Sequence, residues 1–255
     1  MAYYVWICLS TKDIPKQNGR GSMSVMKSYK QKFDTFKEVL AKENPVIVEI
    51  GAHFGEDSMR FSETFPEAKI FCFEPDPRCV NVFKKYVNND RIKLFELALS
   101  DTNGTAEFYQ SFDESKSDFV PEKYDWIDIE DYKNNKLSNS GSSSLKSGYR
   151  NNLDKIVVNT RRFDDWYIEN PIGDIDLLWI DVQGAEKEVL DGIGNVMNNV
   201  ALVWIEYGEK EYQGALSREE TISYMKDKGF LVVDSLSSNT DAGDLMLYNS
   251  MRYSI

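Results

Sequence analysis

The sequence predicts an α/β fold with a mostly parallel central sheet of about seven strands and helices on both faces. Short apolar runs, typical of buried parallel strands, alternate with stretches of helical periodicity along most of the chain. Several of these runs end in an acidic residue. A chain of 255 residues also has the length at which a doubly wound sheet commonly forms one domain. We therefore expect residues 1–255 to form a single domain with right-handed crossovers.

The first half of the chain shows a regular alternation of helices and strands. Residues 1–44 are expected to form an N-terminal arm and an amphipathic helix over 25–42, which Pro45 ends. The expected strands that follow cover 46–50, 69–74 and 92–99, and the helices between them run from 56 to Pro66 and over 77–87. This order predicts parallel strand pairing.

Between residues 110 and 154 the periodicity gives way to charged and polar residues, with a serine-rich stretch at 140–144. We interpret this segment as an inserted loop near the substrate and not as a second domain. Loops of this length are commonly either lids or passive insertions, and both interpretations stay open. Its aromatic residues suit a carbohydrate-like acceptor or lie in a solvated loop: Tyr124, Trp126, Tyr132 and Tyr149.

Periodicity returns in the second half of the chain. It resumes at 156–158, and two strong strand patterns, 175–181 and 201–206, each end in an acid. Helices are expected over 185–192 and 218–228, and 231–233 with 245–248 suggests a closing hairpin. Trp179 and Trp204 lie within the strand patterns, where core positions are the simpler interpretation.

Composition narrows the class of protein. A net charge of -12 argues against a general nucleic-acid binder, because phosphate contacts require clustered Lys and Arg. The apolar stretch at 2–9 lacks the basic start of a signal peptide, and no window approaches the roughly 20 apolar residues of a membrane span. We expect a soluble, cytoplasmic protein. Cys8, Cys72 and Cys79 fit neither a metal motif nor a disulfide pattern, and we expect reduced, structural thiols.

The turn from Glu49 to Gly55 carries the first binding signal. An acid at a strand end precedes two glycines spaced four apart, and a helix follows. Glycines allow close approach of the backbone to a ligand, and the helix start offers unpaired amide hydrogens. A nicotinamide-type loop would need a third, middle glycine, which this turn lacks. Glu74 closes the next strand, where a carboxylate can accept both ribose hydroxyls; its alternative is a solvated strand end.

These residues belong to a wider pattern that resembles the FkbM family of S-adenosylmethionine-dependent methyltransferases. The stretch 47–55 resembles the family's first motif, 73–75 its ribose-binding turn, and 97–101 with Gly104 the segment flanking the adenine. Residues 142–145, Thr160 and 163–165 resemble the stretch before the fourth core strand, and 180–186 with 189–190 and Gly192 resemble its most recognisable block. The resemblance covers 46–206. His53 stands where the family more often has Asn, and Gln183 where it more often has Glu.

The resemblance implies a Rossmann-like class I methyltransferase fold and S-adenosyl-L-methionine as cofactor. The implied reaction moves the sulfonium methyl group to a hydroxyl, most often of a sugar or natural product. We expect a sugar or glycan acceptor, with a small hydroxylated metabolite as the alternative. The expected cofactor-binding residues are Glu49, Gly51, Ala52, His53, Gly55, Glu74, Pro75, Ala98, Leu99 and Asp181.

Three residues are candidates for the chemistry. Asp181 lies at the carboxyl end of a central strand, where open α/β sheets bind ligands, and it is a candidate base or metal ligand. Glu206 ends the next strand and is the second candidate, with a plain ion pair as the alternative. His53, the only histidine, suits a base by its ordinary pKa, although its place in the loop favours binding or packing. Glu186 is expected to favour a helix start through the helix dipole.

A divalent cation is possible but not predicted. Asp164 and Asp165 could join Asp181 in a metal site, because hard cations prefer carboxylate oxygens. Two rival classes remain: a non-catalytic module that retains the cofactor fold, and a nicotinamide oxidoreductase, which the loop spacing disfavours. The sequence does not predict the oligomeric state.

Overall fold

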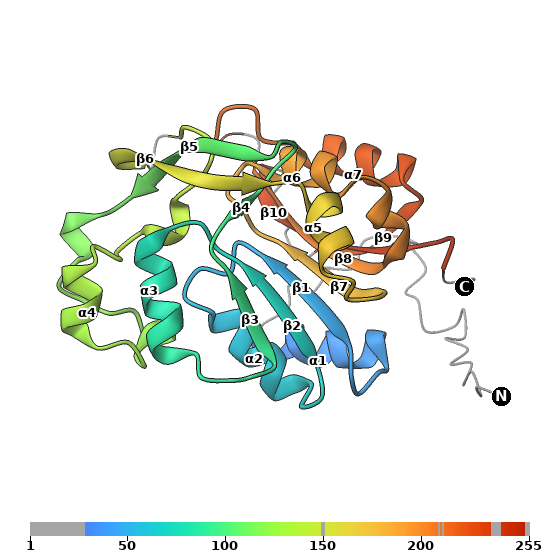
Figure 1. The fold of residues 1–255 in the computed structure, drawn as a ribbon, viewed down its shortest axis with the longest axis horizontal. Helices are drawn as coiled ribbons and strands as arrows, with labels where there is room; N and C mark the ends of the chain where they lie inside the picture. Colours follow the sequence, from blue (N-terminus) through green and yellow to red (C-terminus); the bar gives the residue numbers. More distant parts are fainter. Residues whose placement is uncertain (1–28, 149–150, 209, 211, 236–240, 253–255) are drawn as a thin grey trace, which may run out of the picture.

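The computed structural model describes residues 29–148, 151–208, 210, 212–235 and 241–252, and its centre is a seven-stranded sheet. Its strand order is β3-β2-β1-β7-β8-β10-β9 (Figure 1). The strands are β1 (Val46–Ile50), β2 (Lys69–Phe73), β3 (Ile92–Phe95), β7 (Ile175–Ile180), β8 (Val200–Gly208), β9 (Phe230–Ser235) and β10 (Ala242–Asn249). Only β10 pairs antiparallel with its neighbours among these strands. The mostly parallel sheet and the closing hairpin are confirmed.

Helices cover both faces of this sheet, as expected. On one face α1 (Tyr29–Leu40), α2 (Glu56–Thr64) and α3 (Pro77–Tyr86) contribute phenylalanines to one apolar cluster. On the other face α5 (Phe163–Glu169), α6 (Glu186–Ile193) and α7 (Arg218–Asp227) pack against a second cluster (Figure 1). No helix within the described ranges is long and apolar enough to cross a membrane. The start expected for the first helix, 25–28, and the arm at 2–9 with Cys8 lie outside the described residues.

The two strand tryptophans belong to the core. Trp179 and Trp204 are 2% and 1% exposed, and their rings stack with centroids 5.1 Å apart. The ammonium of Lys32 in α1 lies 3.8 Å from the centroid of Trp179 and 4.3 Å from that of Trp204. This arrangement holds a half-buried cation against the sheet through attraction to the aromatic faces.

The prediction of one strand over 92–99 was wrong. The chain turns after β3, where the Leu97 amide donates to the Phe95 carbonyl, and β4 (Ala98–Leu99) joins a separate sheet. In that sheet β6 (Asn151–Arg161) pairs parallel to β4 and antiparallel to β5 (Gly104–Ser111). A strand of only two residues leaves no periodic signal, so the second sheet escaped the sequence analysis.

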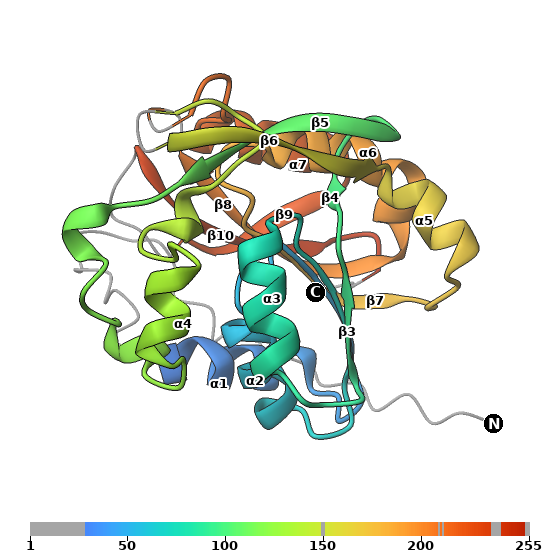
Figure 2. The same cartoon turned by 60° about the vertical axis from the view of Figure 1, so that its left-hand side comes forward.

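The described part of the segment 110–154 packs on the rest of the fold through a buried apolar cluster. It contains α4 (Ile129–Asn134) and a 3₁₀ turn at Ser140–Ser142, and it lies beside α3 (Figure 2). Its apolar residues form a cluster with residues of the turn after β1 and of α3: Tyr124, Ile127, Tyr132 and Leu137 with Phe54, Cys79 and Val82. Trp126 packs at the edge of this cluster, and Tyr149 lies outside the described residues. Cys72 and Cys79 are buried free thiols, as expected.

Candidate active site

A cavity of about 730 Å³ opens at the carboxyl ends of β1, β2, β7 and β8, and the segment 110–154 forms its opposite wall. The predicted site residues that line it are Glu49, Gly51, Ala52, His53, Glu74, Pro75, Ala98, Leu99, Asp181 and Glu206. Gly55 does not line it. The strand ends therefore gather nearly all the predicted residues around one space, since carboxyl ends of parallel strands meet at one edge of a sheet.

The turn after β1 depends on glycine for internal reasons. Gly51 has φ +86°, and a Cβ atom there would lie 1.8 Å from the carbonyl oxygen of Asp181. Gly55 has φ +85°, and its Cβ would lie 2.7 Å from side-chain atoms of Phe83 and Val87. Both glycines thus allow the turn to press against its neighbours. Gly55 was expected to allow close approach of a ligand. Its neighbours are instead Phe83 of α3 and Val87, the residue after α3.

Glu74 is a buried carboxyl group held by two backbone amides. The amide of His53 donates to Oε2 at 2.8 Å, and the amide of Asp76 donates to Oε1 at 2.7 Å. Burial, with the negative charge of Asp76, raises the pKa of Glu74 to about 8. A carboxyl group has further acceptor sites on both oxygens, so Glu74 can still receive two hydroxyl hydrogens from the cavity.

Glu49 sits deeper than Glu74. It is 2% exposed and accepts hydrogen bonds from the hydroxyl of Ser58 and, at 3.7 Å, from the thiol of Cys72. Burial raises the pKa of Glu49 well above its ordinary value. These contacts tie the end of β1 to α2 and β2, so Glu49 shapes the floor of the cavity.

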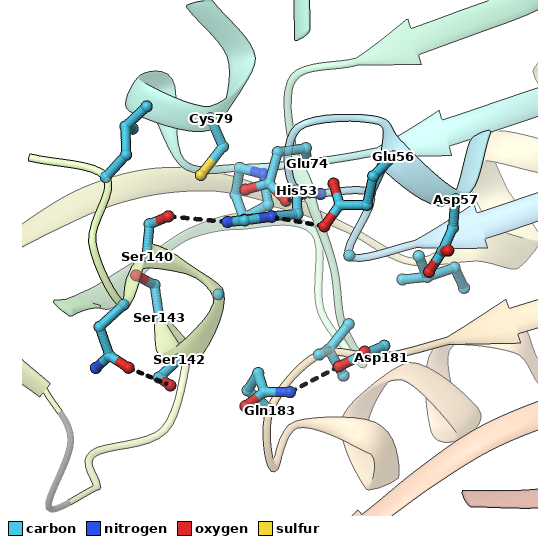
Figure 3. Close-up of a pocket in the computed structure, with 18 of the residues that line it drawn as sticks. His53, Glu56, Asp57, Glu74, Cys79, Ser140, Ser142, Ser143, Asp181 and Gln183 are labelled. Atoms are coloured by element: carbon cyan, nitrogen blue, oxygen red, sulfur yellow. Dashed lines mark hydrogen bonds and ion pairs between the residues drawn. The ribbon is translucent and has the colours of Figure 1, made fainter. Parts of the chain in front are cut away.

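His53 joins the turn after β1 to the serine-rich segment. Its Nδ1 lies 3.1 Å from Oε1 of Glu56, and its Nε2 lies 2.8 Å from Oγ of Ser140 (Figure 3). The residue has φ +50°, a left-handed conformation that side chains seldom adopt. Since both ring nitrogens have partners, the geometry favours the binding or packing interpretation over a free base.

Asp181 and Glu206 are brought together by a residue that sequence reasoning did not select. Nε2 of Gln183 donates to Oδ1 of Asp181 and to Oε2 of Glu206, each at 2.7 Å. Figure 3 shows the amide pointing at Asp181 inside the cavity. Burial, followed by the charge of Asp181, raises the pKa of Glu206 well above its ordinary value. Burial and the neighbouring charge therefore favour the protonated form of Glu206.

Glu186, Asp164 and Asp165 do not line the cavity. Glu186 is 1% exposed, and its Oε1 accepts from the amides of Val182 and Gly184, just before α6. Burial raises the pKa of Glu186 to about 7. Asp164 and Asp165 do not line the cavity, because Arg162 binds the first and Asn103 the second.

The metal site considered with Asp181 is therefore not assembled. Asp164 and Asp165 are held on α5, away from the cavity that Asp181 lines. Among the residues that the structure describes, no three His, Cys, Asp or Glu side chains are grouped to hold a metal ion.

The structure adds residues with no recognisable sequence signal. Lys32 is half-buried in a network of charges with Asp57, Asp181 and Asp244, and desolvation lowers its pKa despite these acids. Burial also raises the pKa of Asp244 to about 6. The hydroxyl of Tyr212 lies 3.1 Å from Oε1 of Gln183. These residues come from α1, α2, β10 and a loop, so only the fold brings them together.

The strand order, with one antiparallel strand and acids at the carboxyl ends of the parallel strands around one cavity, defines the architecture of class I methyltransferases. The chain belongs to the FkbM methyltransferase family, because the family model described as "Methyltransferase FkbM domain" matches residues 49–232.

Two curated relatives are similar over most of their length. The 2-O-methyltransferase NoeI of Sinorhizobium fredii (strain NBRC 101917 / NGR234) is 33% identical over 214 residues, which cover 83% of this chain and 82% of NoeI. Methyltransferase sdnD of Sordaria araneosa is 29% identical over 215 residues, covering 77% and 81%. Among solved structures, a putative rRNA-methylase from Clostridium thermocellum aligns with a TM-score of 0.47 at 10% identity, over 89% of this chain and 97% of that one.

Proposed function

We propose that this chain uses S-adenosyl-L-methionine to methylate a hydroxyl oxygen of a sugar or glycan. The observation that carries the proposal is the carboxyl pair Asp181 and Glu206 inside the cavity that the cofactor turn also lines. Similarity to a 2-O-methyltransferase over more than four-fifths of both chains supports transfer to oxygen.

The cavity fits this cofactor in the chemistry of its walls. Glu74 would accept the ribose hydroxyls, and its raised pKa reflects a buried carboxyl group with spare acceptor capacity. Ala98, Leu99 and Phe108 provide an apolar wall for a flat base. Gly51 and Ala52 would hold the cofactor's amino-acid end beside the turn. When bound, the cofactor supplies an electrophilic methyl group.

The chain's own residues would then align the acceptor and take its proton. An in-line displacement depends on placing the acceptor oxygen against the methyl carbon, so orientation supplies much of the rate enhancement. An alcohol also loses its proton during the transfer, and a positioned base commonly contributes about 10²–10⁴-fold. We assign this proton to Asp181, because burial and the charge of Asp181 favour the protonated form of Glu206, which is then the poorer acceptor.

The acceptor would enter along the segment 110–154. Its part of the cavity wall combines hydroxyl, ammonium and aromatic groups, which suit the polar edges and apolar faces of a sugar ring: Ser115, Lys116, Phe119, Lys123 and Ser143. The net charge of -12 supports an acceptor other than a nucleic acid.

The proposal is tested by two linked measurements. Calorimetric titration with S-adenosylhomocysteine, with and without a divalent cation, should show binding at micromolar Kd, and absence of binding would favour a non-catalytic module. Methyl transfer to a panel of saccharides is then compared for the natural protein, Asp181→Asn and the exposed control Asp227→Asn. We expect Asp181→Asn to lower kcat by about 10²-fold or more. Unchanged turnover in that variant would show that Asp181 is not the base.

A further inference from the structure

The turn that follows β7 places one amide group between the two strand-end acids. Gln183 has φ +56°, and this left-handed conformation aims its side chain back across the end of the sheet. Its two Nε2 hydrogens are both used, one on Asp181 and one on Glu206, at equal distances of 2.7 Å. An amide nitrogen offers two donors and no acceptor, so it can serve two carboxyl oxygens at once.

The other end of the same amide is also held. The hydroxyl of Tyr212 lies 3.1 Å from Oε1 of Gln183 and 2.9 Å from the carbonyl oxygen of Ser142. Tyr212 is 5% exposed, and its ring packs so closely on Gly184 that a Cβ atom there would lie 2.4 Å from Cβ of Tyr212. The tyrosine is thus fixed by packing, and its one hydroxyl hydrogen, shared between the Ser142 carbonyl and Oε1 of Gln183, favours the amide orientation in which Nε2 faces the acids.

We propose that Gln183 is a positioning residue that holds Asp181 and Glu206 as one acid–base unit, and that Tyr212 orients its amide. This inference rests on the proposed function, because it assigns the geometry of the proposed base. The hydroxyl of Tyr212 also contacts Ser142, so the serine-rich wall of the cavity and the acid pair are set by one side chain.

The charges around Asp181 and Glu206 determine how the apparent pKa values of the pair should change when the Gln183 amide is removed. The acids that face Glu206 are Asp181, Glu186 and Asp244, and Lys32 is the cation that interacts with Asp181 and Asp244. In this acidic setting a carboxylate gains from each donated hydrogen bond. Removal of the amide should therefore raise both apparent pKa values of the coupled pair.

The test compares Gln183→Leu, Gln183→Glu and Tyr212→Phe with the natural protein. Gln213→Leu, on an exposed neighbouring residue, is the matched control for the glutamine variants, and Tyr224→Phe, whose hydroxyl bonds Asp191 outside the cavity, is the control for the tyrosine. Circular dichroism and thermal melting identify variants that fold. The carboxyl groups are titrated by ¹³C NMR in the free protein, and kcat is measured against pH.

We expect the apparent pKa values of the pair to rise by about 1 unit in Gln183→Leu, and further in Gln183→Glu, which adds a like charge. Tyr212→Phe should shift them in the same direction by less. The low-pH limb of the kcat profile should move to higher pH in the same order, and kcat near pH 7 should fall about tenfold or more in Gln183→Leu. The controls should match the natural protein.

Two results would overturn the inference. The first is a folded Gln183→Leu protein whose carboxyl titration coincides with that of the natural protein. The second is a loss of kcat that is uniform across pH, since a merely structural role would act that way. The NMR titration needs no substrate, so a natural protein that methylates no saccharide counts against the proposed function and leaves the positioning of the acids to be judged by its own measurement.

Discussion

The imidazole Nε2 of His53 lies 2.8 Å from the hydroxyl oxygen of Ser140, although 87 residues separate them in the sequence. The first residue belongs to the turn after β1, and the second to the segment that forms the opposite wall of the cavity. Gly141, the next residue, also lies close to the imidazole: a Cβ atom at Gly141 would lie 3.7 Å from Nε2 of His53. One contact therefore joins the two walls between which the cofactor and acceptor would meet.

Loss of this contact should affect the acceptor more than the cofactor. Ser140→Ala removes a hydrogen bond commonly worth about 0.5–1.5 kcal/mol, so we expect the KM for the acceptor to rise about 2- to 12-fold. The Kd for S-adenosylhomocysteine should change by less than about twofold. Ser117→Ala is the control, since Ser117 is half-buried and its hydroxyl donates locally to the Glu114 carbonyl. A selective loss of cofactor affinity in Ser140→Ala would contradict this expectation.

Glu74 should be needed for cofactor affinity. Glu74→Ala removes the carboxyl group proposed to accept the ribose hydroxyls and leaves the amides of His53 and Asp76 without their partner. We expect the Kd for S-adenosylhomocysteine, measured by calorimetry, to rise at least about tenfold, because two hydrogen bonds of about 0.5–1.5 kcal/mol each would be lost. Glu67→Ala, at an exposed site before β2, should bind normally. Normal binding by folded Glu74→Ala would show that the ribose assignment is wrong.

Gly51 should tolerate no side chain. Gly51→Ala would place Cβ 1.8 Å from the carbonyl oxygen of Asp181, in addition to the cost of a left-handed alanine. Gly173→Ala has a similar φ of +81° and open space around the site, so it measures the backbone cost alone. We expect Gly173→Ala to lower the free energy of unfolding by about 1–2 kcal/mol and Gly51→Ala by clearly more, in urea denaturation. Equal losses of unfolding free energy in Gly51→Ala and Gly173→Ala would mean that the turn after β1 can move away from β7.

Glu186 should make stability depend on pH. Its pKa is raised from 4.5 to about 7 in the folded protein, so the folded state binds its proton more tightly than the unfolded state does. This contribution is fully present below pH 4.5 and is lost as pH rises through 7. Between pH 5 and 8 the free energy of unfolding should therefore fall by about 1–3 kcal/mol on account of this group.

Glu186→Gln tests that dependence, since it retains the oxygen that accepts from Val182 and Gly184 but cannot ionise. Urea denaturation at pH 5, 6, 7 and 8 should show a smaller fall for this variant than for the natural protein. Glu169→Gln, on an exposed side chain, should follow the natural curve. Parallel curves for all three proteins would exclude Glu186 as a source of the dependence.

The sheet and the place of the site could be predicted because local signals were strong. Buried parallel strands are apolar on both faces, so their runs are continuous and their ends are sharp. Glu74, Asp181 and Glu206 follow such runs, and parallel pairing alone brings their ends to one edge. The predicted hairpin and the core positions of Trp179 and Trp204 follow from the same patterns.

The rest depended on contacts between segments that are distant in the sequence. Pairing of Ala98 with Thr160 creates the second sheet, and neither short segment indicates the other. Gln183 was noted only as a missing charge, because its partners Glu206 and Tyr212 lie 23 and 29 residues away. Conversely, the proposed link of Asp164 with Asp181 failed because Arg162, two residues before Asp164, binds it locally.

In the segment 110–154, the residues that anchor the segment to α3 include some that do not lie at the cavity entrance. Ile127 is nearly fully buried in the cluster with Cys79 and Val82 of α3 and does not line the cavity, so its burial stabilises the segment by itself. Phe119, by contrast, borders the cavity yet is 69% exposed, so its replacement costs the fold little. If the proposed acceptor binds along this segment, the choice of acceptor can change at such positions while the anchoring of the wall stays unchanged.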